Sequence, residues 1–204
     1  MKAYIKTFIL FLIQLIEKYE YRNKELDEDD ISKKILDTLS VKDILIETDT
    51  GFSPISNIHK TQPYKIYKIL TSGNKKLAGA DNHILFDEKY NEIFIKDLTA
   101  GSLIQTKDGV EKVISIKSTS QSISMFDVTV EDENHRFYSN GILSHNCVGF
   151  DTIIDIMFYK NGKQITKKVI LGELYYISLK KKRKLTAIEW IKFFIWKLYS
   201  RTIQ

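Results

Sequence analysis

One short stretch of the chain, residues 144–152, concentrates residue types that can do chemistry. It reads SHNCVGFDT and places His145 and Asn146 directly before Cys147, the single cysteine in 204 residues. The Asn146 amide can attack its own backbone carbonyl, which closes a succinimide and breaks the next peptide bond, and the Cys147 thiol can attack the same carbonyl to form a thioester. Histidines move protons near neutral pH, as both reactions require. We therefore expect the Asn146–Cys147 bond to be reactive.

Two other kinds of site could use the same residues. His135 lies in ENHRFYSNGILSHNC and His83 in GADNHILF, so three of the four histidines are candidates for one site. A zinc site could use two histidines, the cysteine and a carboxylate, but the chain has no Cys-x-x-Cys or His-x-x-x-His unit. A cysteine-protease nucleophile would pair the thiol with a histidine, but this leaves Asn146 without a role.

The composition indicates one globular unit without a disulfide framework. The 31 basic and 26 acidic residues give a net charge of +5, and much of the excess lies in KKKRK at 180–184. This is a local bias, so we expect no nucleic-acid partner. The uncharged run 7–16 has about half of the roughly 20 residues that span a bilayer, so we expect no membrane partner. We also expect the protein to be cytoplasmic and a monomer.

Helical spacing of apolar residues predicts helices at both ends of the chain. The first covers 3–20, and a second, short helix is expected over 26–40, where acidic residues precede Ile31, Ile35, Leu36 and Leu39. The run TAIEWIKFFIWKLYSR predicts a third helix near the C-terminus. Each end is therefore expected to present an apolar helical face.

The region from about residue 41 has a different pattern. Short β-type runs are separated by turn signals such as Thr-Gly, Ser-Gly-Asn and Asp-Gly, without intervening helices. After Cys147, TIIDIMFYKNGKQITKKVIL predicts a hairpin that turns at Asn161 and Gly162. These runs predict a mainly β, antiparallel and curled body.

Three segments resemble the motifs of inteins, the self-excising protein-splicing elements. MFDVTVEDENHRFYSNGILSHNC resembles their C-terminal splicing motif, and SGNKKLAGADNHILF resembles the motif that carries their catalytic histidine. CVGFDTIIDI, followed by KKVILGELY, resembles their opening motif. The resemblance covers about residues 41–177 and is closest to compact phage-type inteins, several of which are split near the N-terminus. It implies the Hint fold, a β-horseshoe with pseudo-twofold symmetry.

The resemblance also implies roles around the thiol. Cys147 would perform the N-to-S acyl shift, and His83 would polarise the amide at that junction and protonate its leaving nitrogen. Asp127, in MFDVTV, would tune the thiol and coordinate the acyl-transfer steps, which include transthioesterification. Many inteins have a threonine where this chain has Ala80. A solvent molecule or a backbone donor would have to substitute for it.

The remaining implied roles concern asparagine cyclisation. Asn146 would cyclise to a succinimide, His145 would be the penultimate histidine, and His135 would assist the cyclisation. No cofactor or metal is needed for this single-turnover, autocatalytic chemistry. The partners implied are flanking exteins or a complementary intein fragment.

The motifs stand in the reverse of the usual order, since the closing motif comes before the opening one. This order predicts a circularly permuted intein domain at 41–178, composed of a C-intein-like part, 41–146, and an N-intein-like part, 147–178. The remainder would be a helical extension, 1–40, and a basic connector with an amphipathic helix, 179–204. The apolar faces of the two extensions would associate, and KKKRK would attract ELDEDD.

Two other interpretations remain open at this point. In one, residues 1–146 are a split C-intein and everything from Cys147 is extein without a structural role. In the other, the chain is an inactive Hint scaffold that binds a partner or a membrane surface through its terminal helices.

Overall fold

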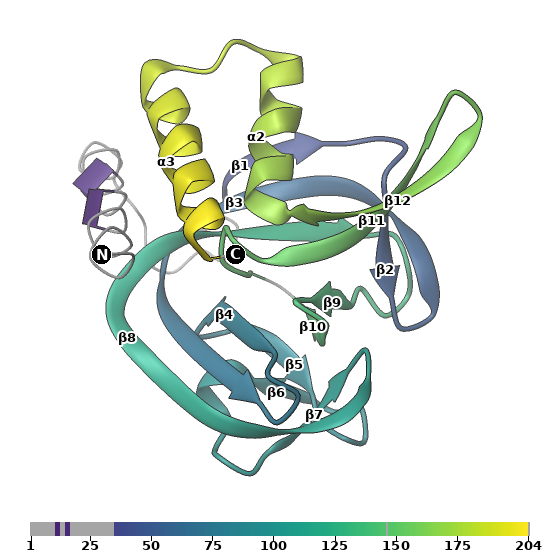
Figure 1. The fold of residues 1–204 in the computed structure, drawn as a ribbon, viewed down its shortest axis with the longest axis vertical. Helices are drawn as coiled ribbons and strands as arrows, with labels where there is room; N and C mark the ends of the chain where they lie inside the picture. Colours follow the sequence, from purple (N-terminus) through teal and green to yellow (C-terminus); the bar gives the residue numbers. More distant parts are fainter. Residues whose placement is uncertain (1–10, 13–14, 17–34, 146, 204) are drawn as a thin grey trace.

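The computed structural model describes residues 11–12, 15–16, 35–145 and 147–203, and β-strands dominate these ranges. Figure 1 shows the strands and the two C-terminal helices. The strands are β1 (Ile35–Ser40), β2 (Leu45–Thr48), β3 (Gly51–Thr71), β4 (Lys76–Ala80), β5 (Ile84–Phe86), β6 (Glu92–Phe94), β7 (Leu103–Thr106), β8 (Gly109–Val130), β9 (Phe137–Ser139), β10 (Ile142–His145), β11 (Ile153–Lys160) and β12 (Lys163–Ile170). The helices are the 3-10 helix η2 (Ile95–Asp97), α2 (Leu171–Lys182) and α3 (Ala187–Ile203).

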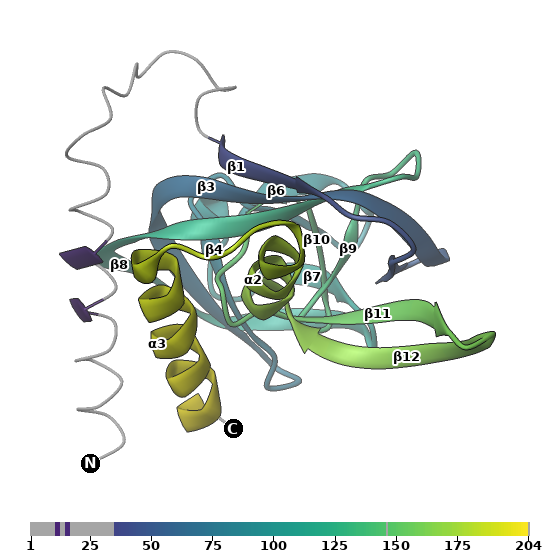
Figure 2. The ribbon, with the colours of Figure 1, turned by 90° about the horizontal axis from the view of Figure 1, so that it is seen from above.

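Two long antiparallel strands, β3 and β8, form the frame of the molecule. They pair along most of their 21 and 22 residues, and their register shifts between Lys60 and Pro63 and again between Lys65 and Tyr67. Such irregularities bend a strand and increase its twist. Figures 1 and 2 show the two strands curving together across the molecule. The predicted mainly β, antiparallel and curled body is confirmed.

The remaining strands extend this frame into one sheet. Its strand order is β12-β11-β2-β3-β8-β7-β10-β5-β6, with β1 and β4 also pairing with β3, and β9 with β10. The predicted hairpin is confirmed as β11 and β12, and Asn161 and Gly162 at its turn have φ of 51° and 73°. Through β11, the segment after Cys147 joins the sheet, because Ile156 pairs with Ile46 of β2.

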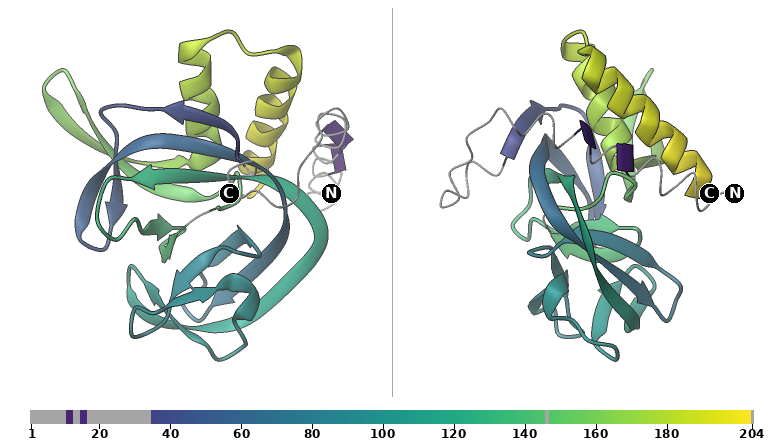
Figure 3. Two further views of the ribbon diagram at one scale, coloured as in Figure 1. Left: turned by 180° about the vertical axis from the view of Figure 1, so that it is seen from behind. Right: turned by 90° about the vertical axis from the view of Figure 1, so that its left-hand side faces the viewer.

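The core of the helical end is aromatic. Tyr175 and Tyr176 of α2 are 2% and 1% exposed, and their rings lie 5.3 and 6.4 Å from that of Phe126 on β8. Phe150 packs on the same cluster at 5.7 Å from Phe126. Figures 1 and 3 show α2 and α3 together at one end of the molecule, away from β5, β6 and β7. Residues after Cys147 therefore complete the core built by the residues before it.

The helix predicted over 26–40 is wrong for residues 35–40, which form β1. Leu39 pairs with Ile58 of β3 and is 4% exposed, and Asp37 on the same strand accepts a hydrogen bond from the Tyr175 hydroxyl of α2. Five residues of β1 pair with residues 57–61 at the edge of β3, and this pairing outweighs a weak local preference for helix. Residues 26–34 lie outside the described residues.

The other helical predictions have different outcomes. Phe11, Leu12, Leu15 and Ile16 are helical, and the rest of 3–20 lies outside the described residues. The predicted C-terminal helix is confirmed as α3, whereas α2 was not predicted, and Lys180–Lys182 of the presumed connector belong to it. Among the described helices, none combines the length and the apolar character that crossing a membrane requires.

Candidate active site

The segment that begins at Cys147 lies between β4 and β8 and is bonded to both. Val148 exchanges two backbone hydrogen bonds of 2.8 Å with Phe126 of β8. On the other side, the Gly149 amide donates to the Ala78 carbonyl at 2.9 Å, and the Ala80 amide donates to the Cys147 carbonyl at 3.3 Å. The backbone on the downstream side of the predicted reactive bond is thus held by two strands.

The thiol of Cys147 is buried in this position. The residue is 9% exposed, and burial raises the pKa of the thiol well above its usual range, with a further rise from the charge of Asp127. At neutral pH the thiol therefore keeps its proton, and its attack on a carbonyl requires a base to remove it. The chain stores the nucleophile in its unreactive form.

Asp127 follows Phe126 on β8 and lies directly opposite His59 of β3. Its Oδ1 accepts a hydrogen bond from the Val128 amide at 2.8 Å, but burial dominates and raises the pKa of the carboxyl to about 7. A carboxyl group with this pKa can hold or release a proton at physiological pH. Asp127 is therefore suited to exchanging a proton with the thiol.

The raised pKa of Asp127 makes stability depend on pH. An unfolded aspartate has a pKa of about 3.9, so from about pH 4 to pH 7 the folded chain holds a proton that the unfolded chain has lost, and stability falls as pH rises. We expect Asp127→Asn to be more stable than the wild type at pH 8, with a free energy of unfolding higher by about 1–2 kcal/mol. The gain is smaller than the full pKa shift would give, because Asp127 keeps some solvent contact. Urea unfolding at several pH values should show this difference shrinking toward pH 4. A constant difference would contradict the shift.

His83 lies on the other side of the site and is fully buried at 0% exposure. Its backbone amide donates to the Ala80 carbonyl at 3.0 Å, which makes a turn between β4 and β5. Its ring packs against Gly79, where an added Cβ would lie 2.9 Å from Cβ, Cγ and Cδ2 of His83. Because Gly79 pairs with Val148, the imidazole packs against β4, one of the two strands that hold the Cys147 segment.

Replacing Gly79 should displace His83. We expect Gly79→Ala to lower the free energy of unfolding by about 1–3 kcal/mol, because the new methyl group would overlap Cβ, Cγ and Cδ2 of the buried His83 side chain. Urea unfolding measures this loss. Gly149→Ala is the control, since its Cβ would come no closer than 3.2 Å to any residue beyond its chain neighbours, the nearest atom being Oδ1 of the Asp151 side chain. Equal stability of Gly79→Ala and the wild type would contradict the close packing of His83.

The other two candidate histidines, His135 and His145, lie on the upstream side of the predicted bond. His145 ends β10 and pairs with Ile84, the residue after His83. The His135 ring lies 6.4 Å from that of His145, and its Nδ1 is 2.9 Å from the Val130 carbonyl. A carbonyl only accepts, so Nδ1 carries a hydrogen and Nε2 is the basic nitrogen of the neutral ring. Asn146 lies outside the described residues.

The structure thus gathers the five described candidates around one segment, with Cys147, Asp127 and His83 at its downstream side and His145 and His135 at its upstream side. Their catalytic roles remain predictions. Among the described residues, no group of three or more His, Cys, Asp or Glu side chains could hold a metal ion.

Two polar groups near the thiol were not predicted from the sequence. Tyr64 of β3 is partly buried, and burial, followed by the charges of Cys147 and Asp81, raises the pKa of its phenol to about 12. The side chain of Asn82 hydrogen-bonds to this phenol. Tyr64 sits within a long strand, where no local pattern marks it, whereas Asn82 stands beside His83 in the quoted motif. Gly79 was also missed, although a glycine inside a strand often indicates a close approach.

Parts of the chain are similar to known proteins, in sequence to a DNA polymerase and in structure to inteins. No protein-family model matches the chain. A DNA polymerase of Thermococcus aggregans is 34% identical over 93 residues, which cover 42% of this chain and 5% of the polymerase. The chain therefore spans about a twentieth of the length of this curated relative.

The solved structures to which the chain is similar include three inteins. The VidaL intein aligns with 50% of this chain and 70% of its own, at 25% identity and a TM-score of 0.48. The gp41-1 intein aligns with 54% and 99%, at 22% identity and a TM-score of 0.44. A consensus engineered intein (Cat) with an atypical split site aligns with 61% and 96%, at 27% identity and a TM-score of 0.46. Each alignment covers about half to three fifths of this chain.

Proposed function

We propose that the chain is a self-processing protein-splicing domain that breaks its own Asn146–Cys147 bond. The observation that carries this proposal is the place of that bond, which connects His145 at the end of β10 with the segment held between β4 and β8. Candidate proton carriers lie on both sides of it, with Asp127 on β8 and His83 in the turn before β5 on one side and His145 at the end of β10 on the other. The motif resemblance points to the same bond from the sequence.

The first step of the proposed reaction is an N-to-S acyl shift. The Sγ atom of Cys147 attacks the carbonyl carbon of Asn146, the C–N bond breaks, and the nitrogen of Cys147 becomes an amine. The thiol proton leaves to a base, and the nitrogen gains a proton, so that no atom is lost. Asp127 is placed to accept a proton near the thiol, and His83 to donate one to the leaving nitrogen.

The second step is cyclisation of Asn146. The side-chain nitrogen attacks the same carbonyl carbon, which closes a succinimide and releases Cys147, either as the thiol of the thioester or directly as the amine. His145 and His135 are the bases on this side of the bond. The products are residues 1–146 with a C-terminal succinimide and residues 147–204 with a free N-terminal cysteine.

The arrangement of the domain supports circular permutation within this proposal. In the sheet, β11 pairs with β2, and Leu171 and Tyr176 of α2 are buried at 0% and 1% exposure. An extein without a structural role would not pack in this way. We therefore propose that residues 147–178 supply the opening part of the splicing domain and that both splice junctions are fused into one bond. The resemblance to compact phage-type and split inteins belongs to the same proposal.

Intact-mass spectrometry of the purified protein tests the proposed function. We expect a 1–146 product one water lighter than its hydrolysed form, because cyclisation breaks the bond without adding water. Its mass and that of 147–204 should therefore sum to the mass of the parent chain. A heavier 1–146 product would indicate hydrolysis of the protease type. A chain that stays intact, with or without dithiothreitol, would overturn the proposal.

A binding module is the second candidate function. On α3, Trp190, Ile191, Phe194 and Leu198 are 44%, 49%, 63% and 41% exposed. A helical face with four large, exposed apolar side chains favours contact with another protein surface. Binding of such a surface by a Cys147→Ala, Asn146→Ala double variant, with no cleavage in the wild type, would favour this function.

A further inference from the structure

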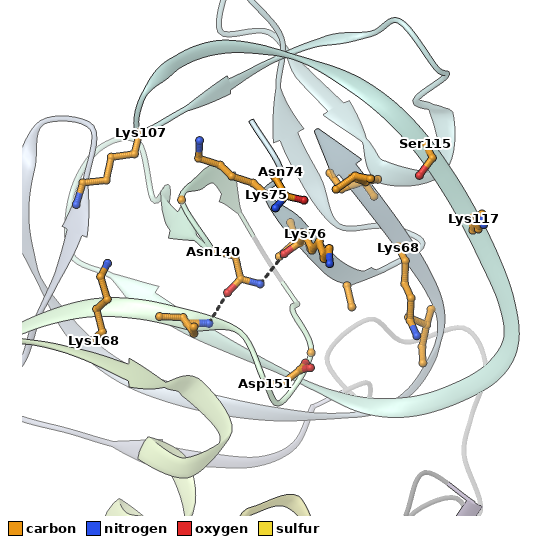
Figure 4. A pocket seen from close by; sticks show the side chains of 18 of the residues that line it. Lys68, Asn74, Lys75, Lys76, Lys107, Ser115, Lys117, Asn140, Asp151 and Lys168 are labelled. Carbon is orange, nitrogen blue, oxygen red and sulfur yellow. Dashed lines mark hydrogen bonds between the residues drawn. The ribbon is translucent and has the colours of Figure 1, made fainter. Parts of the chain in front are cut away.

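A cleft of about 850 Å³ lies between the bent strands β3, β4 and β8 and the base of the β11–β12 hairpin. Its lining is rich in one residue type, since it includes Lys68, Lys75, Lys76, Lys107, Lys117 and Lys168. Figure 4 shows Lys107 and Lys168 at one end of the cleft and Lys68 and Lys117 at the other, with Lys76 and Asn140 between them. The cleft thus carries cationic side chains along its length.

The lysines at the two ends differ in their partners. Carboxylates neutralise three of them, in the pairs Lys75–Asp108 (2.7 Å), Lys107–Glu47 (2.6 Å) and Lys168–Asp155 (2.8 Å). The other three make no ion pair with any residue in the part of the chain that the structure describes. Uncompensated positive charge is therefore concentrated where Lys68, Lys76 and Lys117 lie.

Strand register brings these three lysines together. Lys68 of β3 is directly opposite Lys117 of β8, and Lys76 of β4 is opposite Leu70, two residues from Lys68. Like charges directly opposite each other on a sheet destabilise it. A bound anion would remove this repulsion. The lysine end of the cleft, defined as Lys68 and Lys117 at one end together with the neighbouring Lys76, is therefore arranged for an anionic ligand.

The rest of the lining indicates the class of ligand. Aliphatic side chains, among them Ile66, Leu70 and Ile123, adjoin the lysines, and no described residue that lines the cleft is aromatic or an arginine. Single-stranded nucleic acids are usually held by aromatic side chains on which the bases stack, and such a platform is missing from this lining. We propose that the lysine end of the cleft binds an acidic peptide segment, with carboxylates on the lysines and aliphatic side chains on the isoleucines and Leu70.

The proposed site adjoins the reactive bond but does not depend on its chemistry. Gly149 and Asp151, shortly after Cys147, line the same cleft. A peptide bound there would lie beside the segment that β4 and β8 hold. The proposal therefore goes beyond self-processing, and it can be tested in a chain that is unable to cleave itself.

The probe is a fluorescent peptide with the sequence KELDEDD, which occurs at residues 24–30 of the chain. The receptor is the full chain with Asn146→Ala and with Glu25, Asp27, Glu28, Asp29 and Asp30 replaced by their amides, so that its own acidic run cannot compete. We expect saturable binding by fluorescence anisotropy, weakened by salt. The same peptide with Gln and Asn in place of Glu and Asp should bind at least about tenfold more weakly.

Variants of the receptor locate the site. Lys68→Gln, Lys76→Gln and Lys117→Gln together should weaken peptide binding about tenfold or more, since three charged contacts are lost. The control, Lys42→Gln, Lys160→Gln and Lys163→Gln, makes the same change in net charge outside the cleft and should alter binding less than about twofold. Thermal unfolding should show the cleft variant at least as stable as its parent, because the like-charge pair is removed.

Three results would overturn the proposal. The first is the absence of saturable binding, or equal binding of the acidic and amide peptides. The second is an equal loss of affinity in the cleft and control variants, which would indicate net charge alone. The third is tighter binding of a thymidine oligonucleotide that displaces the peptide, which would assign the lysine end to a nucleic-acid strand. Should the triple variant fail to fold, Lys117→Gln alone should weaken binding about threefold.

Discussion

Asn146→Ala is expected to abolish the succinimide product, because alanine has no side-chain nitrogen to attack the carbonyl of residue 146. The thiol of Cys147 remains in this variant, so the N-to-S acyl shift can still occur. Added dithiothreitol should therefore release residues 1–146 as a thioester or, after hydrolysis, as an acid, which intact-mass spectrometry distinguishes from a succinimide. We expect the rate of spontaneous cleavage to fall by at least about a thousandfold, the scale on which essential reacting groups act.

Cys147→Ala is the matched control for this prediction. It removes the thiol but keeps the asparagine, so cleavage by dithiothreitol should disappear while direct cyclisation continues at a lower rate. A succinimide attached to residues 1–146 in the Asn146→Ala variant is chemically impossible by this route. Unchanged cleavage in that variant would thus assign the break to another residue or to a contaminating protease.

The two cleavage reactions should also differ in their dependence on pH, because the structure raises the pKa of the thiol. Burial, followed by the charge of Asp127, raises the pKa of Cys147, so most molecules hold the thiol protonated at neutral pH. Cyclisation of Asn146 needs no thiolate. We therefore expect the rate of dithiothreitol-dependent cleavage to rise with pH more steeply than the rate of succinimide formation.

The elements predicted correctly are those whose pattern is complete within a short segment. The β11–β12 hairpin has Asn161 and Gly162 at its turn, and both adopt the positive φ that such turns require. The helix α3 has a regular apolar stripe over 17 residues. In each case the neighbouring residues alone favour the observed conformation, so no distant partner is needed.

The elements predicted wrongly or not predicted at all depend on distant partners. β1 has helical spacing but forms a strand because β3 offers a free edge at Thr61 and its neighbours. The helix α2 follows β12 without a break, and its burial against Phe126 and Phe150 depends on residues far along the chain. Local sequence does not contain this information.

The candidate site combines residues that a motif marks with residues that no motif marks. Motif resemblance points to His83, Asp127 and Cys147, whose catalytic roles stay predictions, and all three lie along the segment between β4 and β8. It could not identify Tyr64, because that phenol approaches the thiol only through the bend of β3. Side chains that a bent strand brings to the site have no fixed sequence distance from it.

Ending the chain at residue 146 is expected to unfold the β-body. The truncation removes β11, β12 and α2, and with them the buried side chains Phe150, Ile154, Ile156, Leu171, Tyr175 and Tyr176. At about 1.5–3 kcal/mol for each buried side chain, their loss is on the order of 10 kcal/mol, comparable with the whole stability of an ordinary domain. Urea unfolding followed by circular dichroism should show no cooperative transition for 1–146.

A second truncation separates this effect from the loss of chain length. Ending the chain after Thr186 removes α3 but keeps α2, whose aromatic cluster is built mostly with Phe126 and Phe150. We expect this chain to unfold cooperatively with only part of the stability lost, since Trp190, Ile191 and Phe194 of α3 are largely exposed. Residues 147–186 supplied as a separate peptide should restore folding to 1–146, because β11 and the Val148 bridge need no covalent connection through residue 146. A cooperative transition in 1–146 alone would instead assign residues 147–204 to an extein, and the chain would then be a split C-intein-like domain in its ordinary order.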